Sequence, residues 1–213
     1  MKIEVWSDYN CPFCYIGKVH LERALAELKL TDKVEIIYKA YQLDPSAPKI
    51  ARFSTAEGLA RKYAVSLEEA KAMMSNVVNK AKAVDLTYNY DLVQPTNTYD
   101  AHRVLKMADK AQAKALNAAF YDAYFTKGKN LADYEVLIAF ASEAGMKKDE
   151  VKSMLHSDKF RAEVDADIAE AKAISVRGVP YFRINKKSSI PGAKPIADFV
   201  DVLRNAYVSE MGK

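Results

Sequence analysis

The sequence predicts an α/β fold in which a central sheet flanked by helices is interrupted by a large inserted all-helical domain. Three observations indicate this fold. The chain opens with a strand, a helix and a strand, continues with a long block of helical periodicity, and ends with two short strands and a helix. Strands on either side of a helical block are expected to share one sheet. We therefore expect a core of residues 1–52 and 166–213 and a helical insertion of residues 53–165.

The first strand-helix-strand unit is the most regular part of the pattern. Residues 3–7 alternate in the manner of a strand, and a helix is expected to begin near Cys11. Pro12 suits the first helical turn, where its missing N–H costs nothing. Apolar side chains then recur with a helical period over residues 16–28, and residues 34–38 read as the second strand. Both cysteines of the chain thus fall at the start of this helix.

The inserted block contains start signals for its helices. Ser54 and Ser66 are each followed three residues later by a glutamate, Glu57 and Glu69, as in a capping box. Gly145 stands where a helix is expected to end. The helices are expected near residues 55–64, 67–83, 97–109, 112–126, 133–144 and 148–155.

The last part of the chain returns to strands. A helix is expected over residues 158–174, followed by a short strand over residues 179–184. A polar turn leads into a second short strand at residues 189–190. A final helix is expected from residue 195 to about residue 208, because a proline opens it. These two strands complete the predicted core sheet.

Composition narrows the classes of partner. The chain has 213 residues, with 32 basic and 28 acidic side chains and a formal charge of +4, so no nucleic-acid partner is expected. The longest apolar stretches fall well short of the roughly 20 residues needed to cross a bilayer, so no membrane partner is expected. The N-terminal residues alternate like a strand and lack the pattern of a targeting segment. We therefore expect a cytoplasmic protein.

The chain has only two cysteines, Cys11 and Cys14, and it is too large to need a disulfide for stability. Residues i and i+3 of a helix have Cβ atoms about 5–6 Å apart, so a disulfide between them can open and close with little backbone movement. A thiolate at Cys11 would be favoured by the helix dipole and free N–H groups. We expect Cys11 to attack a disulfide and Cys14 to resolve the mixed disulfide that results.

Two other interpretations of the cysteine pair are possible in principle: two buried apolar side chains, or half of a metal site. Zinc would need two further ligands, and the three histidines, His20, His102 and His156, show no paired spacing. No metal is therefore expected. The position of the pair after a strand and at a helix start favours redox chemistry.

Four stretches carry a resemblance to a known family, and together they span nearly the whole chain: residues 8–17, 97–103, 178–182 and 190–193. The chain resembles the DsbA-like branch of the thioredoxin superfamily. Within that branch it resembles the FrnE-like group, which is related to 2-hydroxychromene-2-carboxylate isomerases and kappa-class glutathione transferases. The resemblance implies a thioredoxin-like core with an all-helical insertion.

The resemblance also implies a substrate site around the cysteines. In thioredoxin-like proteins a cis proline lies against the CxxC motif, and the backbone of the preceding residue pairs with an extended substrate segment. Here these residues are Val179 and Pro180. Pro12 and Phe13, between the sulfurs, complete the implied substrate-binding set and are expected to tune the redox potential. FrnE-like sequences commonly have tryptophan at the position of Phe13, so their redox potential cannot be assumed for this protein.

The function predicted is thiol–disulfide exchange with protein or small-molecule disulfides or dithiols. No cofactor is expected beyond the redox-active Cys11–Cys14 disulfide, with glutathione as a candidate co-substrate. Two alternatives remain: a glutathione-dependent isomerase or transferase, and a chaperone-like peptide binder. The related isomerases and transferases generally carry serine in place of Cys11, so the intact pair argues against them. The sequence leaves open the direction of electron flow and whether the protein is a monomer or a homodimer.

Overall fold

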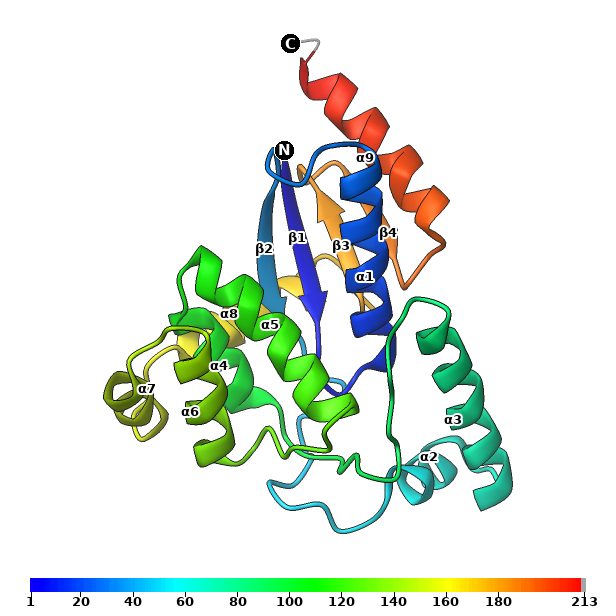
Figure 1. Cartoon of the computed structure of the whole chain (residues 1–213), viewed down its shortest axis with the longest axis vertical. Helices are drawn as coiled ribbons and strands as arrows, with labels where there is room; N and C mark the ends of the chain where they lie inside the picture. The colour runs from blue at the N-terminus through cyan, green and yellow to red at the C-terminus, as the bar shows by residue number, and fades with distance from the viewer. Residues whose placement is uncertain (212–213) are drawn as a thin grey trace. The chain divides into compact units, whose positions relative to one another are not determined.

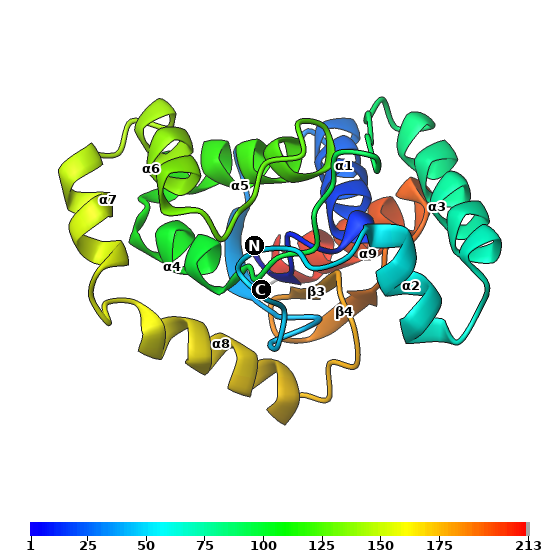
Figure 2. The same ribbon diagram turned by 90° about the horizontal axis from the view of Figure 1, so that it is seen from below.

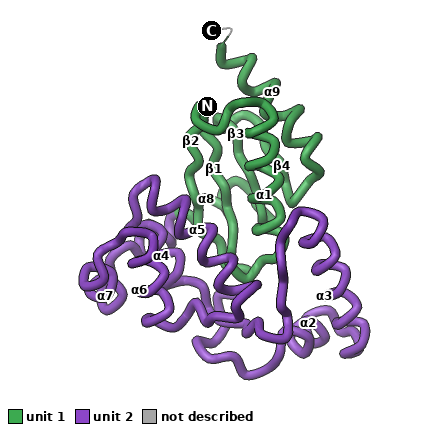
Figure 3. The backbone as a smooth tube through the Cα atoms, in the orientation of Figure 1, with its two compact units in different colours: residues 1–43, 167–213 green, residues 44–166 purple. Residues whose placement is uncertain are grey.

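The structure is a computed structural model that describes residues 1–211, and the chain divides into two compact units (Figure 3). Unit 1 consists of Met1–Leu43 and Asp167–Lys213, and unit 2 of Asp44–Ala166. The first boundary follows Leu43 rather than residue 52. Residues 44–52 belong to unit 2 because they are hydrogen-bonded to it. Asn97 of unit 2 donates its backbone N–H to the carbonyl of Pro48 at 3.0 Å and its side-chain amide to the carbonyl of Ala47 at 3.2 Å.

Unit 1 contains a four-stranded sheet in the order β2-β1-β3-β4. The strands are β1 (Lys2–Ser7), β2 (Glu35–Ala40), β3 (Tyr181–Ile184) and β4 (Ser188–Pro191). β1 pairs with β2 in parallel and with β3 antiparallel, and β3 pairs antiparallel with β4. β3 begins two residues later than the sequence pattern predicts, because the residue before Tyr181 is a proline and has no N–H for the ladder. The sheet thus joins two strands from each end of the chain, as predicted.

Helices cover both faces of this sheet within unit 1 (Figures 1 and 2). α1 (Pro12–Glu27) and α9 (Ile196–Met211) pack on one face. The other face is covered by the last residues of α8 (Arg161–Ala173), a helix that begins in unit 2. The main core lies between the first face and its two helices, and its buried side chains are Ile3, Val5, Leu21, Ala24, Leu25, Leu30, Phe182, Ile184, Ile190, Phe199, Val200 and Leu203.

The second face of the sheet carries charged side chains around Trp6, which is fully buried. The Arg183 guanidinium lies 4.8 Å from the centre of the Trp6 ring, and its Nε donates to Glu4 Oε2 at 2.6 Å. Lys39 Nζ is 2.9 Å from Asp167 Oδ1, and the backbone carbonyl of Asp167 accepts from the Trp6 indole N–H at 3.0 Å. Buried charges are tolerated here because each of these has an opposite partner.

Unit 2 is helical, as predicted. Its helices are α2 (Thr55–Tyr63), α3 (Leu67–Lys82), α4 (Tyr99–Met107), α5 (Lys110–Phe125), α6 (Tyr134–Glu143), α7 (Lys148–Leu155) and the first residues of α8. The capping boxes of α2 and α3 are both present. The predicted boundary between α4 and α5 is wrong. Asp109 was expected to end one helix, but it caps the next through a box with Gln112, so α5 begins at Lys110.

Candidate active site

The two cysteines lie at the start of α1, where the sequence placed them. Cys11 is the N-cap residue with an extended backbone, φ −93° and ψ 110°, and Pro12 is the first helical residue. The backbone N–H of Cys14 donates to the Cys11 carbonyl at 3.1 Å, which closes the first turn around the pair. Both thiols are free and buried, with 3% of Cys11 and 2% of Cys14 exposed.

Val179 and Pro180 lie beside the first sulfur, although they are 168 or more residues away in sequence. The Cys11 thiol donates a hydrogen bond to the Val179 carbonyl oxygen, with a sulfur–oxygen distance of 3.4 Å. The peptide bond between Val179 and Pro180 is cis. Of the two residues between the sulfurs, Pro12 is half-buried and Phe13 is 36% exposed. The structure thus brings together Cys11, Cys14 and the segment that begins β3.

Gly17 permits this close approach. It lies one turn beyond Cys14 on α1, and a Cβ atom built on it would be 2.9 Å from Pro180 Cγ and 3.2 Å from Phe182 Cζ. Separations near 3 Å are below ordinary carbon–carbon contact distances. Only glycine therefore lets α1 pack directly on the start of β3, and this packing holds Val179 beside Cys11.

We expect Gly17→Ala to lower the free energy of unfolding by about 1–3 kcal/mol, because the added methyl group overpacks the contact between Gly17 and Pro180. Helix propensity alone would act in the opposite direction, by about 1 kcal/mol. Urea unfolding measures the difference. Ala26→Gly, at an exposed position of α1, is the control that reports propensity alone. A Gly17→Ala protein more stable than the parent would contradict the packing argument.

The two sulfurs differ in their surroundings. Burial raises the pKa of the Cys14 thiol well above its usual range, and a hydrogen bond to the Cys11 side chain raises it further. The charge of Cys11 adds to the rise in pKa, a backbone hydrogen bond with Asp8 opposes it, and the negative charge of Asp8 makes the smallest contribution to the rise. Cys14 therefore stays protonated near neutral pH. A Cys14 thiol that keeps its proton agrees with an arrangement in which Cys11 attacks first and Cys14 acts later.

Asp8 is a residue of this site that the sequence analysis did not single out. Its side chain is fully buried. Its carboxylate accepts the backbone N–H of Leu43 at 2.7 Å and that of Asn10 at 3.4 Å, and its backbone carbonyl accepts from Cys11 N at 3.0 Å. An aspartate three residues before the first cysteine was visible in the sequence. Its burial under the pair was not, because the partner Leu43 is distant in sequence.

The stretch at residues 97–103 lies in unit 2, where it supports packing. Arg103 has a fully buried side chain whose Nη1 is 2.8 Å from Asp100 Oδ1. Its other nitrogens donate to the carbonyls of Met154 and Lys159 at 2.9 Å each and to the carbonyl of Ser157. Arg103 thus joins α4 to the end of α7 and the turn that follows it.

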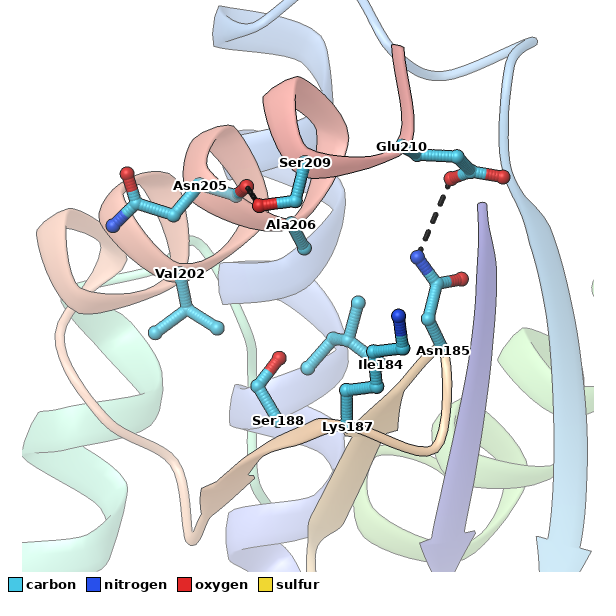
Figure 4. Close-up of a pocket in the computed structure, with 9 residues that line it drawn as sticks. All are labelled: Ile184, Asn185, Lys187, Ser188, Val202, Asn205, Ala206, Ser209 and Glu210. Atoms are coloured by element: carbon cyan, nitrogen blue, oxygen red, sulfur yellow. Dashed lines mark hydrogen bonds between the residues drawn. The ribbon is translucent and has the colours of Figure 1, made fainter. Parts of the chain in front are cut away.

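No group of three or more His, Cys, Asp or Glu side chains within residues 1–211 is arranged to hold a metal ion. Over the same residues, no helix is long and apolar enough to span a bilayer. A pocket of about 520 Å³ lies between α9 and the turn joining β3 to β4 (Figure 4). Asn185 and Glu210, which line it, are hydrogen-bonded to each other at 3.3 Å. This pocket is at the end of β3 opposite Pro180 and contains neither cysteine.

A family model decides the classification. The model described as a DSBA-like thioredoxin domain matches residues 2–204. The chain belongs to this family. The predicted fold class, a DsbA-like thioredoxin fold with a helical insertion, is confirmed.

Solved structures agree with this assignment. A probable DsbA oxidoreductase from Streptomyces coelicolor is 34% identical, with 97% of this chain and 90% of that chain covered and a TM-score of 0.91. A 2-hydroxychromene-2-carboxylate isomerase is 18% identical, with 99% and 96% covered and a TM-score of 0.69. The cytosolic disulfide reductase DsbM from Pseudomonas aeruginosa, solved with glutathione, is 15% identical, with 96% and 98% covered and a TM-score of 0.66. The last two likenesses show a shared fold, and the family is one of thiol oxidoreductases.

Proposed function

We propose that this DsbA-like protein exchanges disulfides with its substrates through Cys11 and Cys14. The observation that carries the proposal is the pair itself: two free thiols one helical turn apart, with the first sulfur 3.4 Å from the Val179 carbonyl. The raised pKa of Cys14, caused chiefly by its burial, supports the assignment of Cys11 as the attacking residue and Cys14 as the resolving residue.

The proposed reaction has two steps. The Cys11 thiolate attacks one sulfur of the substrate disulfide, forms a mixed disulfide and releases the other substrate sulfur as a thiol. Cys14 then loses its proton and attacks Cys11, which forms the Cys11–Cys14 disulfide and releases the second substrate thiol. The substrate gains two electrons and two protons, and the cysteine pair loses them. Run in reverse, the same steps donate a disulfide.

The substrate site that we propose consists of Pro12, Phe13, Val179 and Pro180. The exposed ring of Phe13 offers an apolar contact next to the sulfurs. An extended peptide can bind by pairing its backbone with that of Val179, as in strand addition. Substrates of this shape are segments of protein disulfides, and small disulfides fit the same contacts.

Glutathione is the co-substrate that we propose for returning the pair to its starting state. Two glutathione molecules supply two electrons and two protons to the Cys11–Cys14 disulfide and leave as glutathione disulfide. The DsbM structure, which shares the fold and was solved with glutathione, supports this choice. We place the activity in the cytosol, and recovery of the native protein from an exported cell fraction would contradict that placement.

The test is to trap the mixed disulfide. Cys14→Ser should accumulate a covalent adduct between Cys11 and a peptide disulfide, because the serine hydroxyl cannot resolve it. Intact-mass measurement detects the adduct and peptide mapping locates it. Cys11→Ser is the matched control and should form no such adduct at Cys14. Equal adduct in both variants, or none in either, would refute the proposed roles.

The Cys14→Ser variant also distinguishes disulfide exchange from the alternative activities. A glutathione-dependent isomerase or transferase would keep its turnover in Cys14→Ser and would require glutathione. A chaperone-like binder would suppress aggregation of a client protein with both cysteines replaced by serine. Disulfide exchange instead predicts that turnover is lost in Cys14→Ser and in the variant with both cysteines replaced.

A further inference from the structure

We propose that Leu43 is a specificity-determining residue of the disulfide-exchange site, and that its substrates are disulfide-bonded cysteines flanked by apolar side chains. This inference rests on the proposed function and names the class of substrate for the same site. It depends on where two exposed apolar side chains, Leu43 and Phe13, lie relative to Cys11. Folded proteins bury segments of this composition, so the substrates are chains that are unfolded or partly folded.

Three segments of unit 1 meet at the sheet edge that carries the cysteines. β1 and β2 are parallel and end at the same edge (Figure 1). The chain after β1 leads to Cys11, and the chain after β2 leads to Leu43. β3 is antiparallel to β1 and begins at this edge, directly after Val179 and Pro180. In open α/β sheets, ligands bind outside the carboxyl ends of the strands. Because the strand order is β2-β1-β3, the segments of Leu43 and Val179 border the cysteine loop on its two sides.

Hydrogen bonds hold the chain after β2 against the cysteine loop. Tyr41 N donates to the Ser7 carbonyl at 3.1 Å, so this chain continues alongside the end of β1. Asp8, which is fully buried, then joins Leu43 to the loop. Its Oδ2 accepts from Leu43 N at 2.7 Å, and its backbone carbonyl accepts from Cys11 N at 3.0 Å. One buried residue thus contacts the backbone of both Leu43 and Cys11 and fixes the two segments next to each other.

The apolar side chains on these segments are open to solvent. Leu43 is 38% exposed and Phe13 is 36% exposed, whereas Cys11 is 3% exposed. Within the described part of unit 1, the other large apolar side chains exposed to this degree are Val208 and Met211, near the end of α9. A single exposed leucine is ordinary on a protein surface. Leu43 and Phe13 differ from such a case because both stand on segments that border the reacting sulfur.

Strand spacing indicates which substrate residue meets Leu43. Neighbouring strands are about 4.8 Å apart, and one residue of an extended peptide spans about 3.3 Å. A peptide that crosses this edge with its cysteine at Cys11 therefore places a side chain one or two residues away against Leu43. On the other side of its cysteine, its backbone pairs with that of Val179. An apolar side chain at the first position removes the surface of Leu43 from water, which stabilises the mixed disulfide.

The test compares two symmetrical disulfide-linked peptide dimers that differ only in the residues around the cysteine, which are leucine in one and serine in the other. The release of product thiols gives kcat/KM for each. The parent should prefer the leucine peptide about five- to tenfold, and Leu43→Ser should reduce this preference to about twofold. Leu43→Met keeps an apolar side chain of similar volume and should keep the preference.

Val208→Ser is the matched control, because it removes another exposed apolar side chain of unit 1. Val208 lies near the end of α9, where Glu210 is hydrogen-bonded to Asn185 at the end of β3 opposite Pro180. This variant should keep the preference of the parent. A Leu43→Ser protein that turns over both peptides more slowly by the same factor has lost structure rather than specificity, and that result would overturn the inference.

A second measurement isolates the first attack. In the Cys14→Ser background, adduct formation at Cys11 should be about five- to tenfold faster with the leucine peptide than with the serine peptide, and adding Leu43→Ser should remove most of this difference. If Leu43→Ser does not fold, the preference of the parent decides, and its absence overturns the inference. If Cys14→Ser forms no adduct with either peptide, the proposed function itself fails. If adducts form at equal rates, only the role of Leu43 fails.

Discussion

Replacing Cys11 with serine is expected to lower the rate of disulfide exchange by at least about a thousandfold, because a serine hydroxyl is a poor nucleophile without an activating base and forms no mixed disulfide. The rate is measured as reduction of a peptide disulfide, with product thiols counted over time. Cys11 is buried beside Val179 at the start of α1, so the substitution removes one sulfur and adds no bulk.

The control for Cys11→Ser is the unfolding transition of the same protein, which should match that of the parent closely. A variant that unfolds earlier would lose rate through misfolding rather than through chemistry. A Cys11→Ser protein that is folded and retains its rate would show that the exchange does not pass through this sulfur. It would then favour the glutathione-dependent isomerase or transferase.

Replacing Arg103 with methionine is expected to lower the free energy of unfolding by about 3–5 kcal/mol, because it removes the close, buried partner of the Asp100 carboxylate. Asp100 then keeps only the more exposed Lys49, whose Nζ is 3.5 Å from Oδ2. Three backbone carbonyls, those of Met154, Ser157 and Lys159, also lose one donor each. Urea unfolding followed by far-ultraviolet circular dichroism measures the change, since helices α4 and α7 of unit 2 contribute strongly to that signal.

The chain contains a matched control for this prediction. Asp158 and Arg161 form a second aspartate–arginine pair with the same spacing in sequence and a distance of 2.9 Å, but with the arginine side chain 50% exposed. Arg161→Met should cost no more than about 1 kcal/mol, because exposed ion pairs contribute little. Equal losses for Arg103→Met and Arg161→Met would show that burial of the Arg103 pair does not matter.

The parts of the fold that local chemistry determines could be predicted from the sequence. The capping boxes at Ser54 and Ser66 placed two helices correctly, because the side chain and the backbone groups that it satisfies lie within one turn. The box at Asp109 and Gln112 has the same signal. The sequence pattern does not reveal it, because the polar residues on either side continue a helical period and no glycine or proline separates α4 from α5.

The candidate site could be predicted only in part. Cys11 and Cys14 lie three residues apart in sequence and were found directly, while Val179 and Pro180 came from the family resemblance. Two features depend on packing between distant segments: the contact of Gly17 with Pro180 and the bond of Asp8 to Leu43. A glycine within a helix or an aspartate in a loop has many ordinary explanations, so neither residue type identifies such a role alone.

Trp6 gives the protein a built-in optical probe. It is the single tryptophan of the chain, and it lies in unit 1, with its ring under Arg183 and its indole N–H bonded to Asp167. The fluorescence of the Trp6 indole therefore reports on the sheet of unit 1. The far-ultraviolet circular dichroism of the helices comes largely from unit 2. Comparing the two spectroscopic signals during denaturation tells whether the halves of this molecule melt together or one after the other.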